Sequence, residues 1–166
     1  GRPKGIELTG PNIGKAIAAM HYVLELDTDS IALAPVPFFH VSGLGLAMVS
    51  NVNGSALLLR NPESPAHLAQ ILQEDQVTHA VAVPTVIQFL IATPEAKAAD
   101  WSHLKYMIYG AAPMPVPVLR EATALLGCKF LQSYGLTEST GGVTMLTPED
   151  HRIDTDTTHR LQSVGR

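Results

Sequence analysis

The amino-acid sequence predicts an α/β protein with a largely parallel sheet flanked by helices. Short apolar, β-branched runs recur at intervals of about 25 residues, which is typical of buried strands. Segments with apolar residues at helical spacing lie between these runs, and strands that alternate with helices form βαβ crossovers. With 46% hydrophobic and 16% charged residues, the 166-residue chain is long enough for one buried core.

Five runs are predicted to be strands. They are, in chain order, Ile31 to Ala34, Ala56 to Leu59, His79 to Val83, Tyr106 to Tyr109 and Lys129 to Gln132. Three amphipathic segments between and before them are predicted to be helices. The first contains Ile13, Ile17, Met20 and Leu24, the second Leu68, Ile71 and Leu72, and the third Val118 to Leu126, closed by Gly127.

Two further segments are interpreted from their residue pattern and composition. Gly10 to Ala16 resembles a P-loop, but it is one residue short between its glycines and has no Ser or Thr after Lys15, so we interpret it as a helix start. The polar segment from Thr147 to Gln162 is expected to be a surface loop.

The composition excludes several classes of function. The formal net charge is −4 and there is no block of Lys or Arg, so binding to nucleic acid is disfavoured. The single Cys128 cannot close an intramolecular disulfide, and the histidines lack metal-ligand spacing, so no zinc site is predicted. The apolar stretch Val41 to Val52 is shorter than the roughly 20 residues of a membrane span. We therefore expect a cytoplasmic protein with no integral membrane part.

Three predicted strands are followed by polar or glycine-bearing segments. These are Pro37-Phe38-Phe39-His40, Gly110-Ala111-Ala112-Pro113 and Ser133-Tyr134-Gly135-Leu136-Thr137-Glu138. Because the carboxyl ends of parallel strands meet at one edge of a sheet, and sites gather there, we expect these segments at the same edge.

The segment from Tyr134 to Glu138 carries the most informative set of side chains. Tyr134 is suited to stacking on a base, Thr137 to a phosphate and Glu138 to Mg²⁺, which favours oxygen ligands and shares them with substrate phosphates. The alternative is a solvated turn in which Glu138 caps a helix start.

The other candidate segments carry weaker signals. Gly1-Arg2-Pro3-Lys4-Gly5 supplies glycine N–H groups and a cation for a polyphosphate, or it is a surface turn. Gly110 to Pro113 would let a flat ligand lie against the main chain, or it is a tight strand-to-helix turn. His40 is expected to be a partly buried imidazole at a pocket mouth, although a lone histidine of this kind is more often structural.

In their order and spacing, these segments and the terminal Ser163-Val164-Gly165-Arg166 resemble the adenylate-forming superfamily of acyl-CoA ligases, luciferases and peptide-synthetase adenylation domains. The resemblance spans the whole chain. It implies that residues 1–166 are an internal piece of the large N-terminal AMP-binding domain, without the mobile C-terminal domain. It also implies ATP-dependent activation of a carboxylic acid to acyl-AMP and transfer of the acyl group to CoA, with ATP, Mg²⁺ and the co-substrate CoA. The piece alone is expected to be inactive, because the family's key lysine lies downstream.

The resemblance also implies a role for each matching residue. On the nucleotide side, Gly1 and Lys4 would sit at the ATP phosphates, Gly110, Ala111 and Ala112 along the adenine, and Tyr134 and Gly135 at the base, while Thr137 would contact phosphate and Glu138 would hold Mg²⁺. On the acid side, His40 would gate an acyl pocket lined by Tyr109, Gly110 and Gly135. Thr137, Glu138 and His40 are the implied catalytic residues.

The surroundings of His40 narrow the substrate. His40-Val41-Ser42-Gly43 contains no carboxylate, whereas amino-acid adenylation domains usually have an aspartate here, and a buried ammonium would need a partner. The segment resembles fatty or aryl acyl-CoA ligases, and a fatty acid is expected. Five apolar residues form either the pocket wall or core packing: Phe38, Phe39, Val41, Leu44 and Met48. An adenylate-only or luciferase-like enzyme and a catalytically dead nucleotide-binding module remain alternatives.

Overall fold

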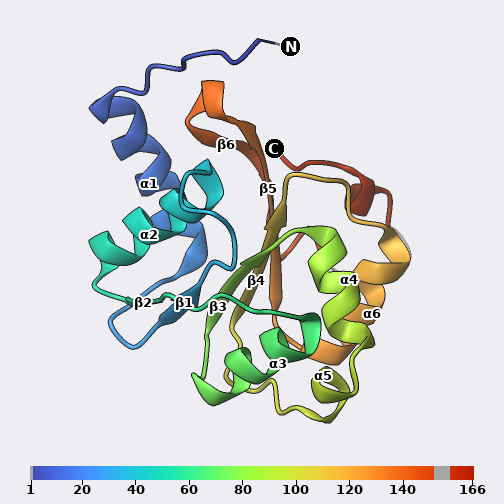
Figure 1. The fold of residues 1–166 in the computed structure, drawn as a ribbon. Helices are drawn as coiled ribbons and strands as arrows, with labels where there is room; N and C mark the ends of the chain where they lie inside the picture. The colour runs from blue at the N-terminus through green and yellow to red at the C-terminus, as the bar shows by residue number, and fades with distance from the viewer. Residues whose placement is uncertain (1, 152–157) are drawn as a thin grey trace.

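A six-stranded sheet with helices on both faces forms the protein, as the computed structural model of residues 2–151 and 158–166 shows (Figure 1). The sheet order is β2-β1-β3-β4-β5-β6, and every neighbouring pair is parallel except β5 and β6. The strands are β1 Ile31–Leu33, β2 Ala56–Leu58, β3 His79–Ala82, β4 Tyr106–Gly110, β5 Lys129–Leu136 and β6 Gly141–Leu146. The predicted α/β class and all five predicted strands are confirmed.

The antiparallel pair β5 and β6 differs from the prediction. β5 does not end at Gln132 but continues to Leu136, and it pairs with β6 from Gln132 opposite Leu146 to Leu136 opposite Gly141. A register irregularity lies between Tyr134 and Gly135. The glycine-rich start of β6 carries no strand signal in the sequence, so this pairing could be found only in the folded chain.

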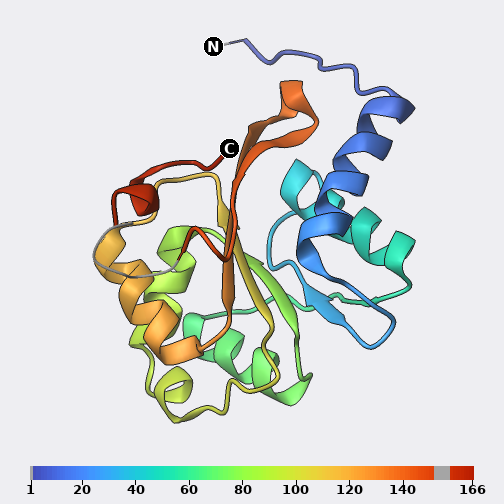
Figure 2. The same ribbon diagram turned by 180° about the vertical axis from the view of Figure 1, so that it is seen from behind.

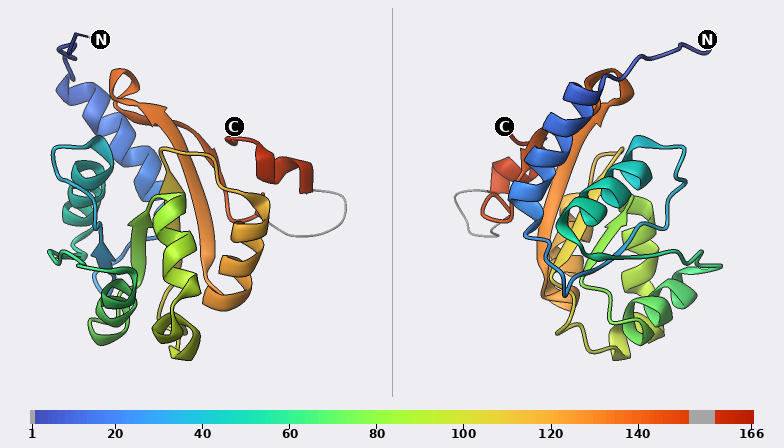
Figure 3. Two further views of the ribbon diagram at one scale, coloured as in Figure 1. Left: turned by 45° about the vertical axis from the view of Figure 1, so that its right-hand side comes forward. Right: turned by 90° about the vertical axis from the view of Figure 1, so that its left-hand side faces the viewer.

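The helices divide between the two faces of the sheet (Figures 1 and 3). On one face lie α1 Gly10–Leu24 and α2 Val41–Asn53, and on the other α3 Pro65–Glu74, α4 Pro84–Ala92, α5 Pro94–Ala98 and α6 Val116–Leu126. The three predicted helices are confirmed, and Gly10 does begin a helix, capped by the Thr9 hydroxyl. The helices α2, α4 and α5 were not predicted. Of the helices in the part of the chain that the structure describes, none is long and apolar enough to cross a bilayer.

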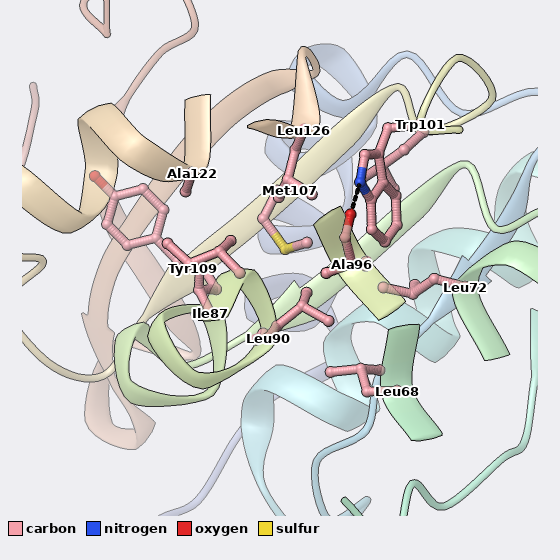
Figure 4. Packing of buried hydrophobic residues seen from close by; sticks show 14 of the residues in the cluster. Leu68, Leu72, Ile87, Leu90, Ala96, Trp101, Met107, Tyr109, Ala122 and Leu126 are labelled. Atoms are coloured by element: carbon pink, nitrogen blue, oxygen red, sulfur yellow. Dashed lines mark hydrogen bonds between the residues drawn. The ribbon is translucent and has the colours of Figure 1, made fainter. Parts of the chain in front are cut away.

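Each face of the sheet has its own hydrophobic core. Met107 and Tyr109 of β4 point toward α4 and α6, and in the same core Trp101 donates a 2.9 Å hydrogen bond to the carbonyl of Ala96 in α5 (Figure 4). Tyr106 and Ile108 of the same strand pack on the opposite face, beneath α1 and α2. Alternate residues of a strand point to opposite faces, so each of these β4 side chains packs in only one of the two cores.

The path of the chain places β1 between β2 and β3 in the sheet. From β1 the chain crosses through α2 to β2 on one side, and it then returns through α3 to β3 on the other side of β1 (Figure 2). The strand order therefore reverses between β1 and β3. In open α/β sheets, ligands bind at the carboxyl ends of the strands at such a switch point.

His79 is a buried titratable residue at the opposite, amino-terminal edge of the sheet. Its Nε2 lies 2.8 Å from the carbonyl oxygen of Leu24 and its Nδ1 lies 2.8 Å from the Thr78 hydroxyl. The ring stacks on Tyr106 with the centroids 5.1 Å apart. Desolvation by burial lowers the pKa of His79 below its ordinary value of 6.5.

Acid is expected to destabilise the fold through His79. Because its pKa is lower in the folded chain, the unfolded chain binds the proton first as the pH falls. The stability that neutral His79 provides is complete above a pH of about 6.5 and is lost as the pH falls toward the lowered pKa, by up to about 1.4 kcal/mol per pH unit. Urea unfolding at several pH values between about 5 and 8 measures this slope. His79→Phe keeps a ring on Tyr106 and should reduce the slope, leaving the part due to His151, whose pKa burial also lowers. An unchanged slope would contradict the assignment.

Candidate functional site

A cavity of about 220 Å³ lies at the carboxyl ends of β3, β4 and β5, against α1 and α2. We call it the α1–α2 pocket. Its walls include Ile13, Ile17 and Met20 of α1, Leu44 and Met48 of α2, and Val81, Ile108, Gly110, Ser133, Gly135 and Gly142 of the sheet. The space far exceeds the roughly 10–15 Å³ that one water requires, so the pocket can hold a small organic molecule.

The residues predicted to form an acyl pocket lie together around this cavity. His40, Tyr109, Gly110 and Gly135 come from three separate segments of the sequence, and all four line the α1–α2 pocket. Of the described residues that line it, none is Asp, Glu, Lys or Arg. The pocket is therefore suited to an uncharged, mainly apolar molecule or part of a molecule.

The predicted apolar wall is only partly correct. Val41, Leu44 and Met48 line the pocket, but Phe38 and Phe39 do not. Phe39 is 90% exposed, because it lies in the turn between β1 and α2 rather than on the inner face of the helix. The apolar wall comes from α1 as well as α2, and the sequence predicts α1 to be a helix without assigning it to a site.

His40 lies at the start of α2 and is more exposed than predicted. It has the extended backbone of an N-cap residue, with φ −96° and ψ 143°, and its side chain does not cap the helix. The sequence led us to expect a partly buried imidazole, but the residue is exposed and lines the pocket from its rim. The cap position explains this, because it lies outside the first turn of the helix.

Tyr109 contributes to the pocket through its place on β4, while its ring lies on the other face of the sheet. The hydroxyl is 2.9 Å from Nε2 of His151 and 3.3 Å from Oε1 of Gln132, and the ring packs against Phe130. Burial raises the pKa of Tyr109. Because the His151 ring lies with Nδ1 2.7 Å from the carbonyl of Thr147, Nδ1 donates there and Nε2 accepts the tyrosine proton. The phenol therefore anchors the segment after β6 and does not face a ligand in the pocket.

Glycine is sterically required where β4, β5 and β6 meet. A Cβ at Gly110 would overlap the carbonyl oxygen of Ser133, and one at Gly135 would overlap the carbonyl oxygen of Gly141. These obstacles are backbone atoms, which cannot move aside as a flexible side chain can. Gly110 and Gly135 thus let three strands approach closely, and they leave bare main chain at the pocket edge.

Ala111 follows Gly110 in a backbone conformation that residues with a side chain rarely adopt. Its φ is +65° and it is exposed at the end of β4. The left-handed region costs a residue with a Cβ about 1–2 kcal/mol. Strain of this kind gathers at functional sites, and here it turns the main chain away from the sheet directly beside the pocket.

Relieving this strain is expected to stabilise the chain. Ala111→Gly should raise the free energy of unfolding by about 1 kcal/mol, because glycine adopts a positive φ without a steric penalty. Ala112→Gly is the matched control, since Ala112 is also exposed but has no positive φ. The control should lower stability by about 0.4–1 kcal/mol through the greater entropy of the unfolded chain. Equilibrium unfolding in urea distinguishes the two, and a loss of stability in both would contradict the strain.

The segment Tyr134 to Glu138 spans the end of β5 and a 3-10 turn. Thr137–Ser139 form the turn, and the hydroxyl of Ser139 accepts from the N–H of Leu136 and donates toward the carbonyl of Gly141. Thr137 and Glu138 are exposed, and Tyr134 is 48% exposed. Glu138 therefore lies in a solvated turn, as the alternative held, but Ser139 rather than Glu138 makes the capping hydrogen bonds.

The structure brings most of the residues predicted to bind the nucleotide to the edge of the sheet where β4 and β5 have their carboxyl ends. Gly110 pairs with Ser133, so Ala111 and Ala112 leave β4 next to the place where β5 continues to Tyr134 and Gly135. Tyr134 alternates with the two pocket-lining residues Ser133 and Gly135, so its ring faces away from the α1–α2 pocket.

The amino-terminal segment is not joined to this edge. Lys4 is exposed, and no hydrogen bond or ion pair connects it with another residue that the structure describes. Gly1 lies outside the described residues. The polyphosphate role of Gly1 and Lys4 stays a prediction.

The site also contains residues that sequence reasoning did not assign. Ser133, Thr140, Gly141 and Gly142 line the pocket from the β5–β6 hairpin. The only sequence signal for them is that Ser133 begins the segment Ser133 to Glu138, which was singled out without a role for Ser133 itself. The role of α1 had a clearer signal, because its apolar stripe needed a partner.

Comparison with known proteins gives one family throughout. The model of the family described as AMP-binding enzyme matches residues 1–166. A feruloyl-CoA synthase from Amycolatopsis sp is 32% identical over 166 residues, which is 99% of this chain and 32% of that protein. The long-chain-fatty-acid–CoA ligase FadD13 of Mycobacterium tuberculosis is 30% identical over 150 residues, which is 90% of this chain and 30% of that protein. The chain thus spans about a third of the length of the curated relatives it matches.

Solved structures share the fold. The inhibitor-bound N-terminal domain of FACL13 from Mycobacterium tuberculosis superposes with a TM-score of 0.89 at 29% identity, covering 100% of this chain and 40% of that one. The O-succinylbenzoate coenzyme A synthetase of Bacillus subtilis, in complex with ATP and magnesium ion, gives a TM-score of 0.79 at 27% identity, covering 90% and 30%. The agreement extends over the sheet and both helix layers.

Proposed function

Since the chain belongs to the AMP-binding enzyme family, we propose that it is part of an AMP-forming acid–thiol ligase that activates a carboxylic acid as acyl-AMP and transfers the acyl group to CoA. In this proposal, residues 1–166 form part of the large AMP-binding domain, and the chain alone is inactive without the mobile C-terminal domain. The similarity to CoA ligases with different acids supports the reaction class.

The observation that carries the proposal is that two groups of residues share one edge. Gly110 and Gly135 line the uncharged α1–α2 pocket. From Gly110 the chain continues to the exposed Ala111 and Ala112, and from Gly135 it continues through Leu136 to the exposed Thr137 and Glu138. An acid whose apolar body fills the pocket would therefore present its carboxylate at the edge where we place the nucleotide.

The proposed chemistry needs little proton transfer. A carboxylate with a pKa near about 4 is ionised at neutral pH and can act as the nucleophile itself. Its oxygen forms a bond to the α-phosphorus of ATP, the bond to the bridging oxygen breaks, and pyrophosphate leaves. The thiol sulfur of CoA then bonds to the acyl carbon, loses its proton to solvent, and AMP departs with the electron pair of the broken C–O bond.

The residues that we assign to the nucleotide position it rather than react with it. The exposed main chain of Gly110 to Ala112 lies along the adenine, Tyr134 stacks on it, and Thr137 donates a hydrogen bond to a phosphate oxygen. Gly1 and Lys4 are proposed to contact the phosphates once that segment folds over the nucleotide. Fixed hydrogen-bond donors and charges placed where negative charge develops are the main source of catalysis in phosphoryl transfer.

The residues at the edge fit a magnesium ion that arrives with ATP. Glu138 offers an exposed carboxylate beside the Thr137 hydroxyl, and both are oxygen donors. No group of three or more His, Cys, Asp and Glu occurs among the described residues that could hold a metal by itself. Mg²⁺ commonly takes only one or two protein carboxylates together with substrate phosphates. When bound, the ion would neutralise phosphate charge, and Glu138 is the residue proposed to hold it.

The pocket favours an acid without a second charge. A buried ammonium or carboxylate on the substrate would lie among apolar side chains without a partner of opposite charge. We propose a fatty acid as the substrate, with an aryl acid as the second candidate, and His40 as the gate at the rim. The similarity to the long-chain-fatty-acid–CoA ligase supports the fatty acid, and the similarity to the feruloyl-CoA synthase supports the aryl acid.

We also propose a cytoplasmic location, which fits the partly buried Cys128. Burial raises the pKa of this thiol to about 12, which keeps it unreactive.

Carboxylate-dependent exchange of pyrophosphate into ATP by the whole protein tests the proposal. Acetate, medium-chain and long-chain fatty acids and an aryl acid should be compared, followed by product formation with and without CoA. Exchange with one class of acid, and a thioester only when CoA is present, is the expected result. Exchange without thioester formation would favour an adenylate-only enzyme. No exchange with any acid, from folded protein, would indicate a nucleotide-binding module without catalysis.

A further inference from the structure

Ser133 places a hydroxyl group on the sheet side of the α1–α2 pocket. Along β5 its side chain shares a face with Leu131, which packs beneath α1 and α2, and with the pocket-lining Gly135. The other strand residues whose side chains face the pocket are Val81, Ile108 and glycines. Among the strand residues whose side chains face the pocket, Ser133 is therefore the polar one, and the rest are apolar or glycine.

The hydroxyl of Ser133 has no partner within the described residues. It is partly buried, and it neither donates to nor accepts from any of them. Space for it exists because residue 142 is glycine, since a Cβ there would lie 2.5 Å from the serine oxygen. The chain thus leaves room for a hydroxyl at this place without using it in its own hydrogen-bond network.

The strand register gives the depth of this hydroxyl in the pocket. Ser133 pairs with Gly110, one layer above the pair Leu131 and Ile108. Gly135 lies two residues further toward the edge, about 7 Å away at the usual rise of a strand. The hydroxyl is therefore just inside the edge at which the carboxylate reacts in the proposed function, so it would face the first carbons of an acid bound there rather than the far end.

We propose that Ser133 makes the site selective for acids that carry a hydrogen-bonding oxygen on the carbons next to the carboxyl group, such as 3-hydroxy acids. This inference rests on the proposed function, because it requires the α1–α2 pocket to hold the acid. A plain hydrocarbon chain would cover the hydroxyl and leave it without a partner. An oxygenated chain restores the hydrogen bond, and discrimination by a single such contact is on the order of 10-fold or more.

Substrate competition with Ser133→Ala tests the inference. The whole protein is assayed with the best unsubstituted acid of the exchange panel, its 3-hydroxy analogue and its terminally hydroxylated analogue. The unchanged protein should prefer the 3-hydroxy acid by about 10-fold in kcat/KM. Ser133→Ala should lower kcat/KM for that acid about 10-fold and leave the other two within about 3-fold. Ser102→Ala, in the exposed loop before β4, is the matched control and should change none of them.

The other outcomes separate this inference from the proposed function. A ratio between the 3-hydroxy and plain acids that Ser133→Ala leaves unchanged would overturn the inference alone, since exchange itself persists. An equal loss for all three acids would also overturn it, because the hydroxyl would then serve the carboxylate that they share. Absence of exchange with every acid would overturn the proposed function and this inference with it.

Discussion

Glu138→Gln in the whole protein is expected to lower carboxylate-dependent pyrophosphate exchange by about 10²–10³-fold. The substitution keeps the size of the side chain and removes the negative charge that we propose holds the magnesium ion beside the phosphates. Removing one preorganised electrostatic contact from a reacting centre commonly has an effect of this order. Because the residue is exposed in a turn whose hydrogen bonds Ser139 makes, the fold should not change.

A matched control separates charge at the site from charge in general. Glu121→Gln removes the same charge from the exposed face of α6 and should leave exchange unchanged. The magnesium dependence adds a second readout, since Glu138→Gln should need a higher magnesium concentration for half-maximal rate. Equal rates in the unchanged protein and Glu138→Gln would remove Glu138 from the mechanism.

Gly135→Ala is expected to destabilise the 166-residue chain by about 3 kcal/mol or more, a loss typical of overpacking against backbone that cannot move. The new Cβ would overlap the carbonyl of Gly141 and lie 2.8 Å from the Cα of Gly142. The β5–β6 hairpin must open to admit it, which breaks the pairing at the register irregularity. Equilibrium unfolding in urea measures the loss.

The control for this change is a glycine with free space. A Cβ at Gly14, inside α1, would meet no atom within 4 Å, so Gly14→Ala should raise stability by about 0.5–1 kcal/mol through its helix propensity. In the whole protein, Gly135→Ala should also lower pyrophosphate exchange, because the hairpin holds Thr137 and Glu138. Stability within about 0.5 kcal/mol of the unchanged chain would show that the hairpin tolerates the side chain.

Local patterns were sufficient for most of the fold. The five parallel strands are short apolar runs, and α1, α3 and α6 have apolar stripes with clear ends, such as Ser64 before α3 and Gly127 after α6. The helix α2 was missed because Gly43 and Gly45 weaken a helical pattern whose inner face is nevertheless buried. The strand β6 was missed because it begins with two glycines and depends on pairing with β5.

The sequence predicted which segments form the candidate site, but it did not predict which of their side chains point into the pocket. Tyr109 and Gly110 are neighbours in the sequence, yet the Tyr109 ring bonds to His151 on one face while Gly110 exposes main chain beside the pocket. Phe38 and Phe39 looked as apolar as Met20, but only Met20 lines the cavity. These differences depend on which residues pack against a segment, and such partners are distant in the sequence.

By itself, the sequence determined the class of fold, the order of the strands along the chain and the three segments that follow them, because runs, periods and turn residues are local properties. Only the tertiary structure decided the position of the strands in the sheet and the pocket wall formed by α1 and α2. It also decided that the Ser133 hydroxyl lies without a partner beside Gly142. A strand has two faces, and its register and neighbours decide which face becomes core and which becomes the wall of a site.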